Sequence, residues 1–191
     1  MMTVIKLHIH SVLAMIGIAL ILFGTSTACS DSKGVQVSTS LTESTARDRI
    51  ITYFAETLQS LPSGVRLSLT PDNRDLSVLD PGFTVPCNDR SGDTSGPVQE
   101  QILYWLVGVP AGQTSHYFAL IRDIWAGKGY RLTSPPDAKP ATVVTPEGYS
   151  LAVQDASKGD GSLSLSAGSP CFPENAKGTT TPQPTVIDRP A

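Results

Sequence analysis

The chain has 191 residues, of which 40% are hydrophobic and 16% are charged, and its formal net charge is −3. An acidic chain lacks the clustered Lys and Arg side chains that nucleic-acid phosphates require, so we expect no nucleic-acid partner. The hydrophobic content is that of one ordinary globular domain, and the chain is long enough to bury a core.

The N-terminal segment has the pattern of a secretory signal peptide. Lys6 precedes an apolar run from Val12 to Phe23, and small and polar residues follow this run. A basic start, a short apolar stretch and a small-residue cleavage site are the parts of such a leader. The run is also shorter than the roughly 20 apolar residues of a membrane span. We therefore expect residues 1–28 to be a signal peptide that is removed on export.

Two interpretations of the cleavage site are open. Ser26 and Ala28 suit ordinary signal peptidase, which would leave Cys29 as a free N-terminal residue or as a crosslink between chains. The stretch Ser-Thr-Ala-Cys also resembles a bacterial lipobox, in which the cysteine becomes the diacylated N-terminus. Three cysteines is an odd number, and pairing Cys87 with Cys171 leaves Cys29 over. This count favours Cys29 as a lipid attachment site.

Cys87 and Cys171 are predicted to form one intramolecular disulfide. Both lie in the body of an exported chain, where thiols are normally paired. Each directly follows a proline at a point where a predicted element begins or ends. The alternative is that both are reduced and buried, which an oxidising compartment disfavours.

The segment after Cys29 predicts a flexible tether followed by a helix. Residues 29–40 are small and polar without an apolar period. From 41 to about 61, apolar residues recur at helical spacing and Arg47 falls off their stripe, so we expect an amphipathic, core-facing helix. The stripe consists of Ile50, Phe54, Leu58 and Leu61, and two pairs stand in capping-box spacing, Ser40 with Glu43 and Thr45 with Asp48.

Three strand regions are expected next. Residues 65–69 alternate as a half-buried strand does, whereas 76–86 can be an irregular loop or a short edge strand. Residues 98–109 contain six consecutive apolar residues and predict a central strand covered on both faces. Tyr104 and Trp105 point to opposite faces of this strand, so one of them lies away from the helices and is a candidate ligand patch. The alternative is that loops or the C-terminal tail cover it.

The second half of the chain predicts one more helix and several strands. Thr114 or Ser115 can cap this helix, and glycines at 127 and 129 end it. Its apolar stripe consists of Tyr117, Leu120, Ile121, Ile124 and Trp125. Short strands are expected at 130–132, 142–144, 149–153 and 162–166, with a hairpin turn at 158–161. Residues 172–191 are rich in Thr and Pro and predict a disordered tail.

This order of elements predicts an α+β fold. Two helices packed on one face of a mainly antiparallel sheet, a two-layer sandwich, satisfy it with short connections. The alternating serines of 162–166 indicate that the other face of the sheet meets water. We expect a single domain over residues 41–171.

The combination of several of these features resembles the LppA-like family of small mycobacterial cell-envelope lipoproteins. It rests on the lipobox-like leader, the Ser-rich tether, the amphipathic first helix, the stretch Val85-Pro86-Cys87 and the closing Gly168-Ser169-Pro170-Cys171. The resemblance covers most of the chain from Met1 to Cys171. It implies a lipoprotein on the extracytoplasmic face of the cell membrane with a disulfide between the two body cysteines, and it brings no catalytic residues.

The sequence offers few residues for a catalytic or metal-binding site. The exported part of the chain has one histidine, His116, and its neighbour Ser115 points elsewhere on a helix, so we expect a surface histidine rather than a catalytic one. One histidine and two paired cysteines leave no zinc ligands of the usual spacing. Asp155, Ser157 and Asp160 are more typical of a polar turn than of a calcium loop, because Gly159 stands at an acidic position.

We therefore expect a non-enzymatic binding or interaction module without a metal or cofactor. Its partner would be an envelope lipid, a glycan or a protein, in addition to the membrane that holds the N-terminal lipid. The alternative is an envelope hydrolase with an unrecognised serine or aspartate site.

Overall fold

The computed structural model describes residues 35–88, 95–155, 162–178 and 182–190, which belong to one compact unit. The predicted signal peptide, Cys29 and the hairpin turn at 158–161 lie outside the described residues. The elements in chain order are α1 (Glu43–Gln59), β1 (Arg66–Ser68), β2 (Phe83–Pro86), β3 (Val98–Val107), α2 (Thr114–Gly127), β4 (Arg131–Leu132), β5 (Ala141–Val144), β6 (Ser150–Asp155), β7 (Leu163–Gly168), the 3-10 turn η1 (Glu174–Ala176) and β8 (Val186–Ile187).

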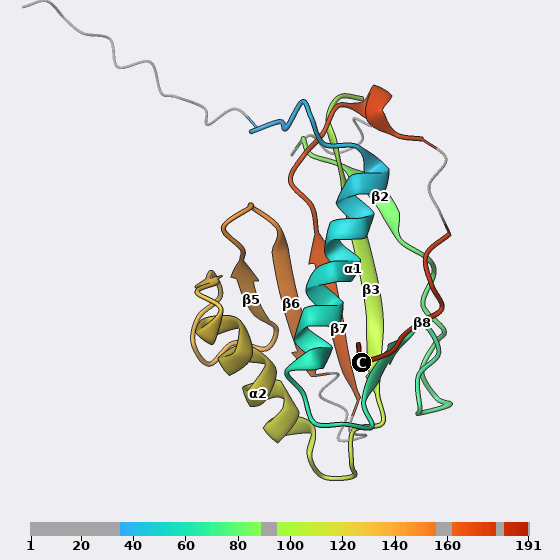
Figure 1. The fold of residues 1–191 in the computed structure, drawn as a ribbon, viewed down its shortest axis with the longest axis vertical. Helices are drawn as coiled ribbons and strands as arrows, with labels where there is room; N and C mark the ends of the chain where they lie inside the picture. The colour runs from blue at the N-terminus through green and yellow to red at the C-terminus, as the bar shows by residue number, and fades with distance from the viewer. Residues whose placement is uncertain (1–34, 89–94, 156–161, 179–181, 191) are drawn as a thin grey trace, which may run out of the picture. The chain divides into compact units, whose positions relative to one another are not determined.

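The strands form one sheet in the order β4-β5-β6-β7-β3-β1-β8, and β2 pairs with β3 beside this path. Every pairing between these strands is antiparallel. The ten-residue strand β3 is its centre, because β7 pairs along most of one side and β2 and β1 share the other side. Residues 83–86 of the undecided region are therefore a strand (Figure 1).

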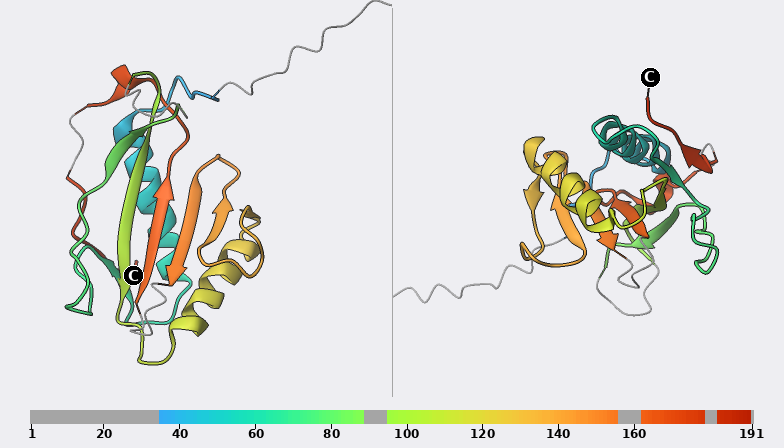
Figure 2. Two further views of the ribbon diagram at one scale, coloured as in Figure 1. Left: turned by 180° about the vertical axis from the view of Figure 1, so that it is seen from behind. Right: turned by 90° about the horizontal axis from the view of Figure 1, so that it is seen from below.

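Both helices cover the same face of the sheet, which confirms the predicted α+β arrangement (Figure 2). From α1, the predicted stripe residues Ile50, Phe54 and Leu58 are fully buried. From α2, Ile121 and Trp125 are fully buried, and the indole Nε1 of Trp125 donates to Thr57 Oγ1 at 3.0 Å. This bond joins the two helices inside the core and satisfies the polar atom that a buried tryptophan brings with it.

The helix starts differ from the predicted ones. The cap of α1 is Thr42, whose Oγ1 accepts from the Thr45 backbone N–H at 3.3 Å while Thr45 Oγ1 accepts from the Thr42 N–H at 3.0 Å. The pairing of Ser40 with Glu43 is wrong by two residues, because the chain enters the helix at Thr42. In α2 the cap position is Gln113, without a side-chain bond, and Thr114 already belongs to the helix.

The prediction that β3 is covered on both faces is wrong. Its residues alternate between buried and half-buried over most of its length, since the helices cover one face and leave the other open. The six-residue apolar run arises because Leu103 and Trp105 occupy the open face beside the buried Ile102 and Tyr104. The serines of β7, Ser164 and Ser166, lie on that same open face, as their alternation predicts.

The domain extends beyond both predicted limits. Val37 forms a bridge to Cys171, and the Ser38 N–H donates to the Cys171 carbonyl at 2.8 Å, so the end of the predicted tether is part of the fold. The prediction of a disordered tail from residue 172 is wrong for its described residues. Phe172 is fully buried, and β8 pairs with β1 and buries Ile187. The tail supplies an edge strand of the sheet.

Candidate functional site

The predicted disulfide is present and joins two segments that lie far apart in the chain. Cys87 and Cys171 are 84 residues apart in sequence, and their Cα atoms are 6.2 Å apart. Around the bond, Val98 and Phe172 exchange backbone hydrogen bonds of 2.9 and 2.7 Å. A small second core of Ala46, Val98 and Phe172 lies at this end of the sheet. We call this region the disulfide end.

The two residues of the candidate ligand patch have different environments. Tyr104 is 0% exposed, stacks edge-to-face on Phe54 at 5.8 Å, and donates from its hydroxyl to the Pro184 carbonyl at 2.6 Å. Burial raises the pKa of this hydroxyl to about 12. Tyr104 is therefore a core residue, and its assignment to a ligand patch is wrong, because α1 and the C-terminal segment cover its face of β3.

Trp105 lies half-buried on the open face and lines a cavity of about 680 Å³. Its indole Nε1 donates to the Ser77 carbonyl at 3.1 Å, which holds the ring against the loop between β1 and β2. The cavity lies where the C-terminal end of β3 meets the start of α2. We call it the Trp105 cavity, and its walls include Asp72, Asn73, Trp105, Thr114, Ser115, Lys139, Asp155 and Ser162.

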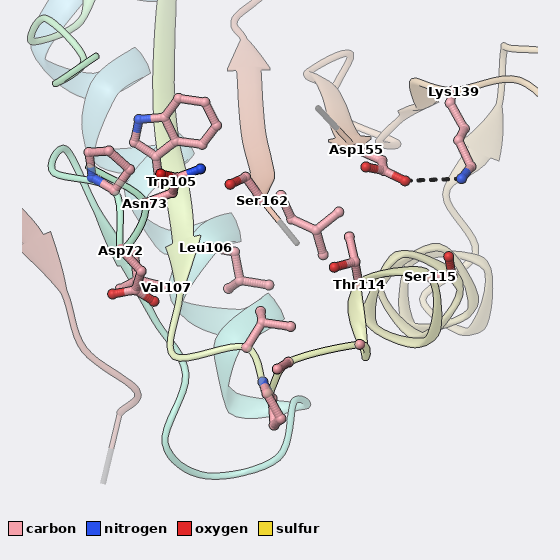
Figure 3. Close-up of a pocket in the computed structure, with 16 residues that line it drawn as sticks. Asp72, Asn73, Trp105, Leu106, Val107, Thr114, Ser115, Lys139, Asp155 and Ser162 are labelled. Atoms are coloured by element: carbon pink, nitrogen blue, oxygen red, sulfur yellow. Dashed lines mark hydrogen bonds and ion pairs between the residues drawn. The ribbon is translucent and has the colours of Figure 1, made fainter. Parts of the chain in front are cut away.

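The charged groups in this wall already have partners. Lys139 Nζ and Asp155 Oδ2 form an ion pair of 3.0 Å, and Asp72 Oδ2 accepts from the Gly108 backbone N–H at 2.6 Å. In the view of Figure 3, Trp105 and Asn73 lie on the β3 side of the cavity, and Thr114, Lys139 and Asp155 lie across from them. The wall thus combines a large aromatic ring with hydroxyl and amide groups and offers no unpaired cation among its described residues.

His116 does not belong to a Ser-His-carboxylate triad in the part of the chain that the structure describes. His116 is exposed at the start of α2, and its ring contacts Tyr117 edge-to-face at 5.8 Å. No hydrogen bond of the described residues joins His116 to a serine or a carboxylate, which a triad would require. The described residues also contain no group of three His, Cys, Asp or Glu side chains able to hold a metal ion.

A buried polar cluster that the sequence pattern did not reveal lies under α1. Arg47 Nε donates to Glu100 Oε1 at 2.8 Å, and Glu43 lies 3.4 Å from Arg47 Nη2. Glu100 is 0% exposed, and burial raises the pKa of its carboxyl although the Arg47 hydrogen bond opposes this shift. Its Oε2 has no hydrogen-bond partner, and neither has Nε2 of the buried Gln183, whose Oε1 accepts from the Gly82 N–H.

The prediction that Arg47 lies off the buried stripe of the first helix is wrong. Arg47 precedes Ile50, Phe54 and Leu58 on the buried side of α1 and is itself buried. One signal was available in the sequence: Glu100 stands between Val98 and Ile102 at an inward position of β3, and an inward carboxylate needs a cationic partner. Because Gln183 belongs to the C-terminal segment, we read the cluster as the attachment of that segment and not as a ligand site.

Neither helix of the described chain is long and apolar enough to cross a membrane. Comparisons with family models, with curated proteins and with solved structures find no match to this chain.

Proposed function

We propose that the chain is an exported lipoprotein of the cell envelope, anchored through Cys29, which binds a ligand in the Trp105 cavity. The observation that carries this proposal is the cavity itself. Its volume of about 680 Å³ falls in the range of roughly 300–1,000 Å³ that is typical of small-molecule sites. Like those sites, it places an aromatic side chain, Trp105, beside several polar groups.

The composition of the cavity supports binding over catalysis. Ser115, one of its hydroxyl-bearing residues, lies next to His116 on α2, and consecutive helical residues do not face each other. Asp155 forms an ion pair with Lys139, and Asp72 accepts a hydrogen bond from a backbone N–H, so both carboxylates have structural partners. The leader and the resemblance to LppA-like envelope lipoproteins support the location on the extracytoplasmic face of the membrane.

The test is a native mass spectrum of the full chain purified in detergent from its own envelope. We expect a bound mass that Trp105→Ala removes and that Phe83→Ala retains. Phe83 is a matched control, because it is an exposed aromatic residue of the neighbouring strand β2 outside the cavity. A folded protein without any bound mass would contradict the proposal.

A serine-reactive probe tests the hydrolase alternative. Stoichiometric labelling of the purified protein that Ser115→Ala abolishes would replace the binding module by an enzyme. We expect no labelling of either protein.

A further inference from the structure

We infer that the open face of the sheet is a docking surface for a second copy of this chain. The open face is the side of β2, β3, β7, β6 and β5 that points away from α1 and α2, and the left view of Figure 2 looks onto it. The residues at the centre of this face lie outside the Trp105 cavity, so the dimer is independent of the proposed ligand.

The described residues of these five strands place no charged side chain on the open face. Residues that pair across neighbouring strands point to the same face, so the register identifies the members of the face. Two of them are the aromatic residues Phe83 and Trp105, and the others are Ser, Thr, Gln, Gly, Ala, Val and Leu residues. Globular domains contain about 25% charged residues, nearly all of them at the surface. The centre of a protein interface, by contrast, is depleted of charge and enriched in aromatic residues.

The charged residue Arg131 appears at the edge of the sheet. It belongs to the edge strand β4, where it is exposed and pairs with Val144 of β5. An uncharged centre with a charged edge is the usual anatomy of an interface between proteins.

The middle strand of the open face carries small residues. β7 presents Ser164, Ser166 and Gly168, with β3 on one side and β6 on the other. A two-fold axis that runs along β7 would lay β3 of one copy over β6 of the other, in the aligned manner in which sheets pack about 10 Å apart. Leu103 and Ala152 flank Ser166 on opposite sides. Leu103 of each copy would therefore pack on Ala152 of the other.

A second row of side chains also complements itself across this axis. Gln101 and Ser150 flank Gly168, and Phe83 and Val144 follow beyond them on β2 and β5. Gln101 of one copy would meet the Ser150 hydroxyl of the other, and Phe83, which is 49% exposed, would pack on Val144. A two-fold contact requires one surface to complement itself. The match of apolar with apolar and of polar with polar residues in this row meets that requirement, and this favours a second copy over a different partner.

The area of the open face reaches that of a specific interface. Its five strands span about 24 Å at a spacing of about 4.8 Å, and the 6 residues of β7 are about 20 Å long. The face therefore measures about 500 Å² in projection, or about 1,000 Å² for two copies, and the relief of the side chains adds to this area. Specific interfaces bury about 1,000 Å² or more in total. We expect a reversible dimer of modest affinity.

The test is sedimentation equilibrium of the full chain in a detergent whose density is matched by the solvent. We expect the parent to dimerise and Ser166→Glu to weaken the dimer by about tenfold or more, because two carboxylates would face each other across the axis. The matched control is Gln113→Glu, which adds the same charge at an exposed position before α2 and should dimerise as the parent does.

Two further measurements separate a lost contact from a lost fold. Ser166→Lys should weaken the dimer as Ser166→Glu does, whereas a mixture of the two variants should form mixed dimers, since opposite charges then face each other. Ser166→Cys, which adds no charge, should be joined to a second copy by a bismaleimide with a reach of about 10 Å, the spacing of packed sheets. Gln113→Cys should give no more crosslinked dimer than the parent.

A parent that sediments as a monomer would overturn the inference. A dimer that Ser166→Glu leaves unchanged, or that Ser166→Glu and Gln113→Glu weaken equally, would show that the copies meet through another surface, and so would a failure of Ser166→Cys to crosslink. The native mass spectrum tests the ligand of the Trp105 cavity separately, so either proposal can fail while the other stands.

Discussion

Removal of the Cys87–Cys171 disulfide is expected to destabilise the domain as a whole and its disulfide end in particular. The bond closes a loop of 84 residues. In the chain-entropy model, opening a loop of this size returns up to about 4.6 kcal/mol of conformational free energy to the unfolded state at 25 °C. That is a large fraction of the roughly 5–15 kcal/mol that stabilises a typical domain.

The structure also predicts where the loss appears first. The disulfide lies next to two sets of backbone hydrogen bonds. One set joins Val98 and Phe172, and the other runs from the Ser38 N–H to the Cys171 carbonyl. None of these contacts involves the residues of α2. In the double variant Cys87→Ala/Cys171→Ala we expect the amides of Ser38, Val98 and Phe172 to lose hydrogen-exchange protection before those of α2 do.

The measurement is urea unfolding followed by tryptophan fluorescence, to which the buried Trp125 contributes. Peptide mapping of the parent without reductant should recover one crosslinked peptide that reduction separates. The reasoning is refuted if both thiols of the native, unreduced protein are alkylated, or if the double variant unfolds within about 0.5 kcal/mol of the parent, the scatter of ordinary surface substitutions.

Three further predictions concern the anchor and the buried cluster. Cys29→Ala should release the protein from the detergent phase into the soluble fraction or stall its processing, because stable anchoring needs the two acyl chains; unchanged partitioning would contradict a lipid at Cys29. Arg47→Met should lower the free energy of unfolding in urea by about 3–5 kcal/mol, because it leaves the Glu100 carboxylate buried without its cation. The double variant Arg47→Met/Glu100→Leu should recover part of this loss. An Arg47→Met variant as stable as the parent would show that the pair contributes nothing. Burial raises the pKa of Glu100, so its contribution to stability is fully present below the ordinary Glu pKa of about 4.3 and is lost as pH rises through the folded-state value. Glu100→Gln should therefore flatten the fall in unfolding free energy above that pH, and parallel pH curves for parent and variant would refute the shift.

The local elements follow from the sequence because their signal is periodic and short in range. In and beside β1, the predicted inward residues Val65, Leu67 and Leu69 are buried, and Ser68 between the two leucines is buried as well. In α2, Tyr117, Ile121 and Trp125 are buried at helical spacing. Each pattern indicates which side of an element is buried on folding, and this side is the same whichever element packs against it.

The helix cap shows the limit of such local reasoning. Ser40, Thr42 and Thr45 all carry a hydroxyl group and lie within six consecutive residues. Which of them caps α1 depends on where the incoming chain turns, and that turn is set by the bonding of Ser38 to Cys171. The deciding contact joins residues that are far apart in the chain.

By itself the sequence determined the order and type of the main elements, the pairing of Cys87 with Cys171, and the presence of the residues Tyr104 and Trp105 on opposite faces of one strand. Only the tertiary structure decided which of the two faces the helices cover, and hence that Tyr104 belongs to the core and Trp105 to a cavity. It also decided that the polar C-terminal segment is ordered, because β8 has two residues and depends on pairing with β1, more than a hundred positions earlier. A strand this short has no period to detect, since its stability comes from hydrogen bonds and burial that a distant neighbour provides.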